Sequence, residues 1–209
     1  IHNFSKQFKT SQNGFKFIYN GLFGYMAYDA VRYFEDVAIS KKDDSADIPD
    51  IYYAVYQNII AINHFKNEAY LFAHCYDTES NVEEMEQLFN VRTFSSYNFN
   101  KEGKPESNLK DEDYKEQVEL AKKHCQRGDV FQLVLSRRFK QKFKGDEFNV
   151  YRALRSINPS PYLFYFDYGD FKIFGSSPEA QLIVKEGKAE IHPIAGTYKR
   201  TGNDEKDAE

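Results

Sequence analysis

The chain has 209 residues, of which 41% are hydrophobic and 29% are charged, so it has enough apolar material for a packed core and is not a wholly disordered protein. Its 28 basic and 32 acidic side chains give a net charge of −4, which argues against nucleic acid as a partner. No apolar run approaches the ~20 residues that a membrane span requires, so we expect no membrane partner either.

The cysteines and the two ends of the chain indicate its compartment and its extent. Cys75 and Cys125 form no CxxC or His-spaced cluster, so we expect two buried, reduced thiols in a cytoplasmic protein. The chain begins at Ile1 without a Met and stops inside a charged stretch at Glu209, which indicates a piece of a longer protein that lacks both termini.

The first hundred residues predict strands followed by a helix. Residues 21–29 mix glycines with aromatic side chains, which is typical of a strand or tight turn, and a short helix is expected at 29–34. Residues 51–62 are apolar and rich in β-branched side chains, and we expect them to form a hairpin with residues 68–76.

A capping box and a polar segment follow. Ser80 and Glu83 have the spacing at which their side chains bond to the exposed amides of a helix start, so a helix is predicted up to Phe89. Residues 95–108 are polar and lack any periodicity, so we predict an irregular boundary segment there. The helix is expected to bury its apolar side chains, which are Val82, Met85, Leu88 and Phe89.

The clearest helix signal lies at residues 111–127. Apolar residues recur there at helix spacing, acidic residues fill the first turn, basic residues crowd the last, and Gly128 follows. Residues 130–139 are apolar on both faces and predict a central strand.

The remaining residues predict one helix and two hairpins. The helix is expected to begin at Asp146 and to stop at Asn158, which precedes a proline. The hairpins are expected within residues 162–174 and 181–192, each around a glycine-containing turn. Helices and hairpins therefore come in blocks, which favours an α+β fold over alternating βαβ units.

Four places carry residues that suit chemistry, although each also fits an ordinary strand end or turn. Gln132 and Arg137 lie in an otherwise apolar strand and need hydrogen-bond partners, of which a ligand is one. The two prolines of residues 158–162 hold their neighbours rigidly. Glu179 is suited to act as a general acid if burial favours its protonated form, and the segment around Gly196 offers an amide and a hydroxyl as a carboxylate or phosphate seat.

The histidines do not suggest a metal site. None of the five shares the spacing of a known ligand pair, so we expect packing or surface roles for them. These residues are His2, His64, His74, His124 and His192.

Taken together, six ordered segments closely resemble anthranilate synthase component I, of the chorismate-utilising enzyme family. The resemblance runs from about Gly21 to the end of the chain. The six segments are GYMAYDAVRYFE (24–35), GDVFQLVLSRRF (128–139), YRALR (151–155), NPSPY (158–162), GSSPE (175–179) and PIAGT (193–197).

The resemblance implies a fold as well as an activity. The fold is an α+β sandwich of two antiparallel-rich sheets with helices outside, incomplete in this chain. Residues 1–106 correspond to the end of the N-terminal regulatory region, and residues 107–209 to the first part of the chorismate-binding catalytic domain.

The implied activity is that of a lyase that converts chorismate and ammonia to anthranilate and pyruvate, the first committed step of tryptophan biosynthesis. The ammonia is expected to come from glutamine through a partner amidotransferase subunit, component II. Mg²⁺ is expected to hold the substrate carboxylate, but the family's metal-binding glutamates and its catalytic histidine fall beyond Glu209. The resemblance therefore places no metal ligand within this chain and implies that the chain by itself is inactive.

The resemblance also assigns roles to four residues. Glu179 is expected to protonate the departing 4-hydroxyl, because hydroxide is a poor leaving group. Gly196 and Thr197 are expected to contact a chorismate carboxylate through an amide and a hydroxyl. Gln132 stands where isochorismate and salicylate synthases have a lysine that activates water, and a neutral amide cannot be that base, which favours ammonia as the nucleophile.

Two further segments bear on the product and on regulation. Ala195 replaces the lysine of the PIKGT segment found in many aminodeoxychorismate synthases, which favours amination at ring carbon 2. Tyr198 departs from the arginine that usually follows PIAGT. The NPSPY segment matches part of the family's tryptophan feedback pocket, whose upstream half we do not find; its residues are Asn158, Pro159, Ser160, Pro161 and Tyr162.

Two alternatives stay open. One is aminodeoxychorismate synthase component I, of the 4-aminobenzoate and folate pathway, because some members lack the PIKGT lysine. The other is a module that senses an aromatic amino acid without catalysis.

Overall fold

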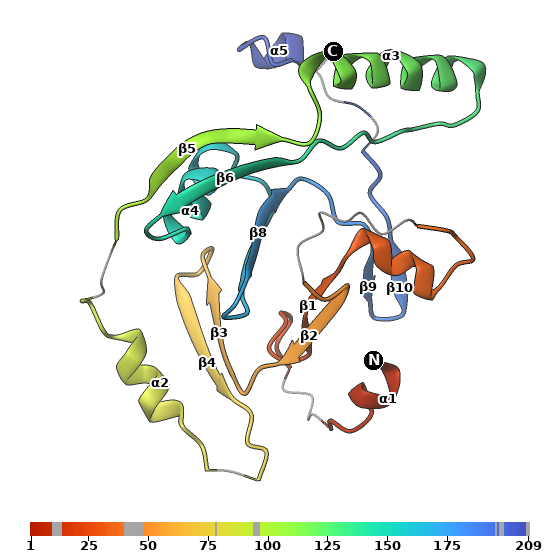
Figure 1. Ribbon diagram of the computed structural model, residues 1–209. Helices are drawn as coiled ribbons and strands as arrows, with labels where there is room; N and C mark the ends of the chain where they lie inside the picture. Colours follow the sequence, from red (N-terminus) through yellow and green to blue (C-terminus); the bar gives the residue numbers. More distant parts are fainter. Residues whose placement is uncertain are drawn as a thin grey trace. The chain divides into compact units, whose positions relative to one another are not determined.

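The computed structural model describes residues 1–9, 14–39, 48–77, 79–93, 97–194, 196 and 199–207. It divides into two compact units, Ile1–Ser95 and Ser96–Glu209. Helices accompany strands that pair only in antiparallel fashion, as an α+β fold predicts, and the described strands form five two-stranded ladders (Figure 1). The described strands form pairs rather than the two larger sheets expected of the sandwich, because each is hydrogen-bonded to a single neighbour.

The first unit begins with α1 (His2–Ser5) and is built on the pairing of β1 (Leu22–Met26) with β2 (Ile51–Val55). The glycine at position 24 lets the two strands approach closely, because a Cβ atom there would lie 1.9 Å from the carbonyl oxygen of Tyr52. The predicted short helix is the 3-10 helix η1 (Tyr28–Tyr33).

An ion pair attaches η1 to the start of β2. Arg32 pairs with the carboxylate of Asp50, and the Tyr33 hydroxyl donates to the same carboxylate over 2.7 Å. The backbone N–H of Ala27 also donates to the Asp50 carbonyl, over 2.7 Å. The GYMAYDAVRYFE segment therefore makes a local structural unit in this fold.

A hairpin of β3 (Asn58–Asn63) and β4 (Glu68–Ala73) follows, and Figure 1 shows the two strands side by side. The side chain of Asn63 accepts the N–H groups of Phe65 and Lys66 and so shapes the turn. The expected single strand at 51–62 is wrong in one respect: it breaks at 56–57, because its halves pair with different partners.

The helix α2 (Val82–Phe89) packs on β4 and ends where the sequence predicts. The capping box does not form, since Asn81 is the N-cap residue and makes no side-chain cap hydrogen bond. Met85 is buried, but Leu88 and Phe89 are exposed, because no described neighbour covers that face of the helix.

The second unit begins with β5 (Asn100–Ser107), which pairs with β6 (Phe139–Lys144). The expectation of an irregular segment at 95–108 is therefore wrong, and the strand spans the boundary expected at 106/107. The sequence of β5 has no alternation of apolar and polar residues, because both faces of the strand are exposed. Oppositely charged cross-strand neighbours stabilise the pairing instead; they are Glu102 with Lys142 and Glu106 with Lys140.

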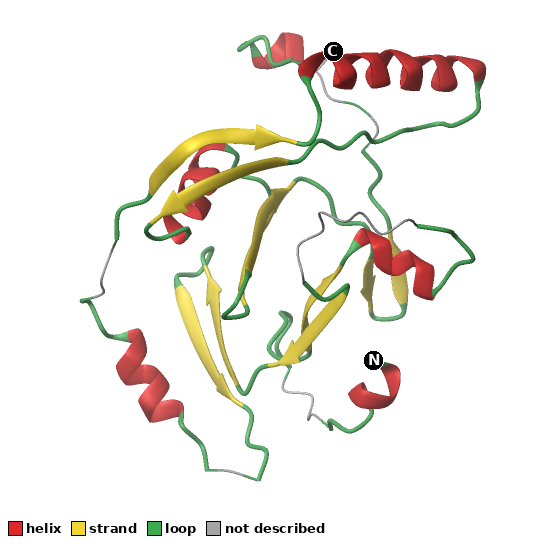
Figure 2. Cartoon of the chain, in the orientation of Figure 1, coloured by secondary structure: helices red, strands yellow, loops and turns green. Residues whose placement is uncertain are grey.

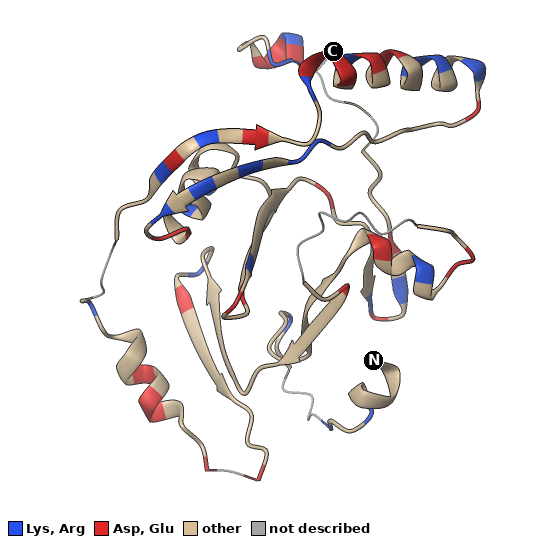
Figure 3. Cartoon of the chain, in the orientation of Figure 1, with Lys and Arg blue, Asp and Glu red and all other residues tan. Residues whose placement is uncertain are grey.

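The helix α3 (Asp111–Arg127) has the predicted bounds and lies between β5 and β6 in the chain. Acidic residues occupy its first turn and basic residues its last, as Figure 3 shows, which matches the polarity of the helix dipole. Gly128 ends the helix with a left-handed φ of 78°. The N–H groups of Gly128 and Asp129 donate to the carbonyls of Cys125 and His124, which is a Schellman motif.

The central strand predicted at 130–139 does not form. Residues 130–138 run as a loop between α3 and β6 in Figure 2, and the strand begins only at Phe139. An apolar run becomes a strand only when another strand accepts its backbone hydrogen bonds, and none among the described residues pairs with this run.

Both cysteines are free and exposed, which corrects the expectation of buried thiols.

The helix α4 (Phe148–Ile157) packs on the hairpin of β7 (Tyr162–Asp167) with β8 (Lys172–Ser177) in the second unit. The helix begins two residues later than predicted, at Phe148 with Glu147 as its N-cap residue, and the Asp146 side chain accepts the N–H of Phe148 at 2.9 Å. Phe148 and Tyr151 pack on Tyr165 of β7, with ring centroids 5.0 and 5.3 Å apart.

The last elements of the described chain are a hairpin and a short helix. β9 (Ile183–Lys185) pairs with β10 (Lys188–Glu190) across the predicted turn, in which Glu186 and Gly187 have positive φ. A short helix, α5 (Asp204–Asp207), ends the described chain. None of the described helices is long and apolar enough to cross a membrane.

The end of α3 yields a prediction about stability. An Ala at position 128 must adopt the left-handed conformation, so we expect Gly128→Ala to lower the free energy of unfolding by about 1 kcal/mol. Gly128→Asn should cost clearly less, because Asn tolerates this conformation. Urea unfolding of the two variants measures the difference, and equal destabilisation by both would contradict the role given to φ.

Candidate functional site

A hydrogen bond joins the GSSPE segment to the PIAGT segment. The backbone N–H of Ile194 donates to Oε1 of Glu179 over 3.2 Å. The two segments lie in the same compact unit and are separated in the chain by the β9–β10 hairpin. The carboxyl group of Glu179 and the backbone that leads to Gly196 therefore lie side by side.

The strand β8 brings Glu179 to this place. Ser177 is the last residue of the strand and pairs with Tyr162 of β7. Its hydroxyl donates to the carbonyl of Glu179 over 3.0 Å and accepts the Glu179 N–H over 3.2 Å. The Glu179 side chain is exposed, so the burial on which its role as a general acid was made conditional is not found among the described residues.

The NPSPY segment lies against the same strand. Asn158 follows the end of α4, and its carbonyl accepts hydrogen bonds from the N–H of Ser160 at 2.9 Å and from the hydroxyl of Ser176 at 2.7 Å. Tyr162 opens β7 opposite Ser177. The residues assigned by resemblance to tryptophan and the residue assigned to acid catalysis thus meet at one end of the β7–β8 hairpin.

The other residues that the resemblance assigns to the site have fewer described contacts than Glu179. Gln132 is exposed in the loop 130–138, and none of the described hydrogen bonds ties it to Glu179. Gly196 is exposed as well. Thr197, together with Ala195 and Tyr198, lies outside the described residues.

The described contacts of Arg137 are with protein groups, and they give it a structural role. Its guanidinium is paired with Asp111 at 2.7 Å, donates to the Ser107 hydroxyl at 2.8 Å, and lies 4.7 Å from the ring centroid of Phe139. These contacts attach the loop 130–138 to the start of α3. The hydrogen-bond partners that sequence reasoning required for Arg137 are therefore protein groups.

Sequence reasoning missed the two groups that hold Glu179. The donor to its carboxylate is the backbone of Ile194, and a main-chain amide leaves no signal in the residue type. Ser177 is part of the GSSPE segment, but only the turn at the end of β8 shows that its hydroxyl contacts the Glu179 backbone.

A cluster of charged side chains lies between the β7–β8 hairpin and the start of α4. Lys172 pairs with Glu147 at 2.7 Å, and this hydrogen bond lowers the pKa of the Glu147 carboxyl. Burial raises the pKa of the neighbouring Tyr165 hydroxyl. The ion pair attaches β8 to the start of α4 and has no contact with Glu179 among those described.

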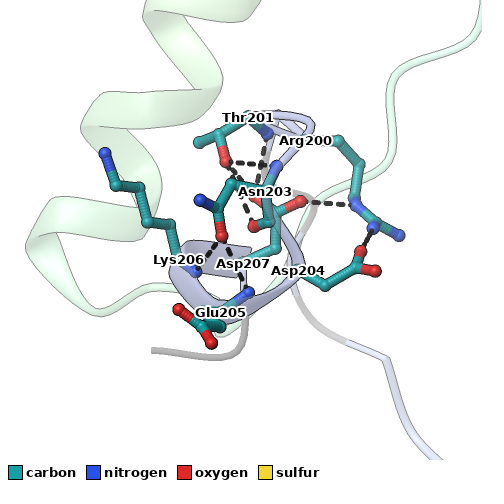
Figure 4. Close-up of polar contacts among 7 residues, drawn as sticks. All are labelled: Arg200, Thr201, Asn203, Asp204, Glu205, Lys206 and Asp207. Carbon is teal, nitrogen blue, oxygen red and sulfur yellow. Dashed lines mark hydrogen bonds and ion pairs between the residues drawn. The ribbon is translucent and has the colours of Figure 1, made fainter.

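Residues 200–207 form a compact polar turn, which Figure 4 shows. Asp207 accepts hydrogen bonds from the N–H and the hydroxyl of Thr201, both at 2.8 Å, and from Nε of Arg200 at 2.7 Å. The hydrogen bond from the Thr201 backbone is the main reason that the pKa of Asp207 lies below its usual value.

Metal ligands do not gather in the described part of the chain. No three His, Cys, Asp or Glu side chains there are placed so that they could hold a metal ion. The described partner of the Glu179 carboxylate is a backbone amide and not a second carboxylate.

Comparison with known proteins identifies relatives along the whole chain. The family model for chorismate binding enzyme matches residues 1–209. Anthranilate synthase component 1 of Aquifex aeolicus is 34% identical over 203 residues, which are 90% of this chain and 41% of that protein. The same component of Saccharomyces cerevisiae is 34% identical over 220 residues, 96% of this chain and 43% of that protein.

A relative with another name and a solved structure also match. Aminodeoxychorismate synthase component 1 of Bacillus subtilis is 32% identical over 220 residues, 99% of this chain and 46% of that protein. The crystal structure of anthranilate synthase component I from Streptococcus pneumoniae superposes with a TM-score of 0.70 at 26% identity, over 90% of this chain and 45% of that one. The chain thus spans less than half the length of these relatives.

The turn in Figure 4 generates a prediction about pH. Because the pKa of Asp207 is lower in the folded chain than in the unfolded one, its contacts stabilise the turn above the unfolded pKa of about 3.9 and are lost as the pH falls through the folded value. We expect the Thr201 amide to exchange its hydrogen about tenfold faster in Asp207→Asn than in the wild-type protein near neutral pH.

Asp204→Asn is the matched control, because Asp204 also pairs with Arg200 but is 93% exposed. Amide hydrogen exchange followed by NMR measures both variants, and a pH titration of the Thr201 amide shift in the wild-type protein gives the folded pKa. Equal exchange in the two variants would remove Asp207 from its central place in the turn.

Proposed function

Because the chain belongs to the family of chorismate binding enzymes, we propose that it is part of anthranilate synthase component I and that it supplies the acid for the loss of the 4-hydroxyl of chorismate. The observation that carries the proposal is the hydrogen bond from the Ile194 N–H to the Glu179 carboxylate. It supports a site in which an acid and a seat for the substrate carboxylate face the same substrate.

The proposed proton transfer follows from this contact. Oε1 of Glu179 accepts the Ile194 N–H, so Oε2 is the atom that carries the proton toward the substrate. As ammonia forms a bond to ring carbon 2, the bond from carbon 4 to oxygen breaks and the hydroxyl leaves as water with that proton. The ammonium group formed at carbon 2 then loses a proton. The proton on carbon 2 leaves as the bond from carbon 3 to oxygen breaks, and the released enolpyruvyl group takes up a proton at its CH2 carbon to give pyruvate and aromatic anthranilate.

Three other residues complete the proposed site. The amide of Gly196 and the hydroxyl of Thr197 are assigned to a substrate carboxylate, since an amide and a hydroxyl both donate hydrogen bonds to an anion. Gln132 is assigned to the side from which ammonia attacks, because its amide cannot take a proton from water. The ammonia is supplied by a glutamine amidotransferase subunit in this proposal, as the component number in the relatives' names suggests.

The expectation of Mg²⁺ rests only on the resemblance to the family. The described residues contain no set of ligands for it. The proton transfer above is therefore assigned to Glu179 without any step through a metal.

Aminodeoxychorismate synthase is the second candidate, because the Bacillus subtilis relative matches 99% of this chain. Ala195 in place of a lysine favours the first candidate. Incubation of the full-length protein with chorismate, ammonia and Mg²⁺, followed by separation of the products, decides between them. Anthranilate supports the proposal, 4-aminobenzoate supports the second candidate, and the absence of turnover supports a sensing module.

The role of Glu179 leads to a kinetic prediction. We expect Glu179→Gln to lower the turnover of the full-length protein by ~10²-fold or more, because the amide cannot donate the proton that a general acid donates. Glu190→Gln, an exposed residue of β10 in the same unit, is the control and should leave turnover unchanged. Steady-state formation of the amination product measures both, and unchanged turnover in Glu179→Gln would exclude it as the acid.

We further propose that tryptophan binds at residues 158–162 and acts on Glu179 through the β7–β8 hairpin. The pairing of Tyr162 with Ser177 and the hydrogen bond from Ser176 to Asn158 support a short connection between the two places.

Loss of a polar group from this segment should weaken the inhibition. We expect Ser160→Ala to raise the tryptophan concentration for half-inhibition about fivefold, the loss that one hydrogen bond represents. Inhibition curves of the full-length protein measure this change. Unaltered inhibition in both Ser160→Ala and Asn158→Ala would contradict the placement of tryptophan here.

A further inference from the structure

A hydroxyl clamp occurs at three places among the described residues of the second unit. In each, a Ser or Thr hydroxyl contacts both the N–H and the carbonyl of the residue two positions later. Ser107 holds Leu109 with distances of 3.3 and 2.8 Å, and Thr201 holds Asn203 with distances of 3.3 and 3.4 Å. The third clamp is that of Ser177 on Glu179, at 3.2 and 3.0 Å.

The third clamp differs because its target carries the proposed acid. Pro178 stands between the two residues, has no N–H to donate and fixes its own φ near −65°. Two of the three contacts that hold Glu179 therefore come from one hydroxyl, and the third comes from the Ile194 amide. Rotation of the Glu179 backbone must break both Ser177 contacts.

The position of Ser177 is itself fixed. It is half-buried at the end of β8 and pairs with Tyr162 of β7. The preceding residue, Ser176, makes its contact with Asn158 instead, because neighbouring side chains of a strand point to opposite faces. The two serines of GSSPE thus have separate tasks.

We propose that Ser177 is a positioning residue for Glu179: its hydroxyl fixes the backbone of the acid so that the carboxyl group faces the Ile194 amide and the substrate. This inference rests on the proposed function, since it assigns a support to the acid of that site. In this proposal Ser177 acts on the reaction through Glu179 alone, because the described contacts of its hydroxyl are with the Glu179 backbone.

Kinetics of the full-length protein test the proposal. We expect Ser177→Ala to lower kcat about tenfold and to leave KM within about twofold, because a misplaced acid slows the chemical step without removing a substrate contact. Ser177→Thr keeps the hydroxyl and a side chain that suits a strand, so it should restore most of kcat. Ser177→Cys, which keeps the size but offers a weak donor, replaces the Ala variant if that variant does not fold.

Ser107→Ala is the matched control. It removes the same clamp from the end of another strand of the same unit, and its hydroxyl contacts Leu109 and Arg137 rather than the proposed site. It should lower thermal stability to a similar degree and leave kcat unchanged. Equal losses of kcat in the Ser107 and Ser177 variants would overturn the proposal, because they would indicate a general effect on stability.

A double-mutant cycle with Glu179→Gln separates positioning from structure. If Ser177 acts only through Glu179, its loss adds no further decrease of kcat when Glu179 is already Gln. A further decrease of similar size in that background, or a kcat for Ser177→Ala within twofold of the wild type, overturns the proposal. Unchanged kcat in Glu179→Gln alone would instead remove the acid from the proposed function, so the two failures are distinguishable.

Discussion

The register in which β7 pairs with β8 is the constraint on which the candidate site depends. Tyr162 lies opposite Ser177, so the hairpin brings the NPSPY and GSSPE segments to the same end. A slip of one residue would turn Ser177 to the opposite face and place Ser176 where it now lies. The hydrogen bond from Ser176 to Asn158 would then be lost, so the tight turn and the packing of α4 that fix this register also hold the two segments together.

Helices and aromatic rings support the ladders, because two-stranded ladders are marginal by themselves. Tyr165 and Phe174 stack across β7 and β8 with centroids 5.6 Å apart, and Tyr151 of α4 packs on both. In the first unit, Phe72 of β4 stacks on Tyr19 at 5.3 Å. Aromatic residues make up 17% of the chain, and in these two hairpins they act through local packing.

The helices and the hairpin turns were predictable because their signals are local. The charges and spacing of α3 and the glycine that follows it gave its bounds to the residue, and glycines marked the turns of β7–β8 and β9–β10. Strands were less predictable. Residues 130–138 look like a buried strand but have no partner among the described residues, and β5 looks irregular but pairs through charged neighbours on β6.

The sequence by itself determined the family, the residue types of the candidate site and the helix bounds, since motifs and caps depend on neighbours in the chain. Only the tertiary structure decided that the Ile194 amide reaches Glu179, that Ser177 holds the Glu179 backbone, and that Arg137 is paired with Asp111. These contacts join residues through main-chain groups or across separate elements. A main-chain amide is the same at every position, so its role follows from where the chain places it.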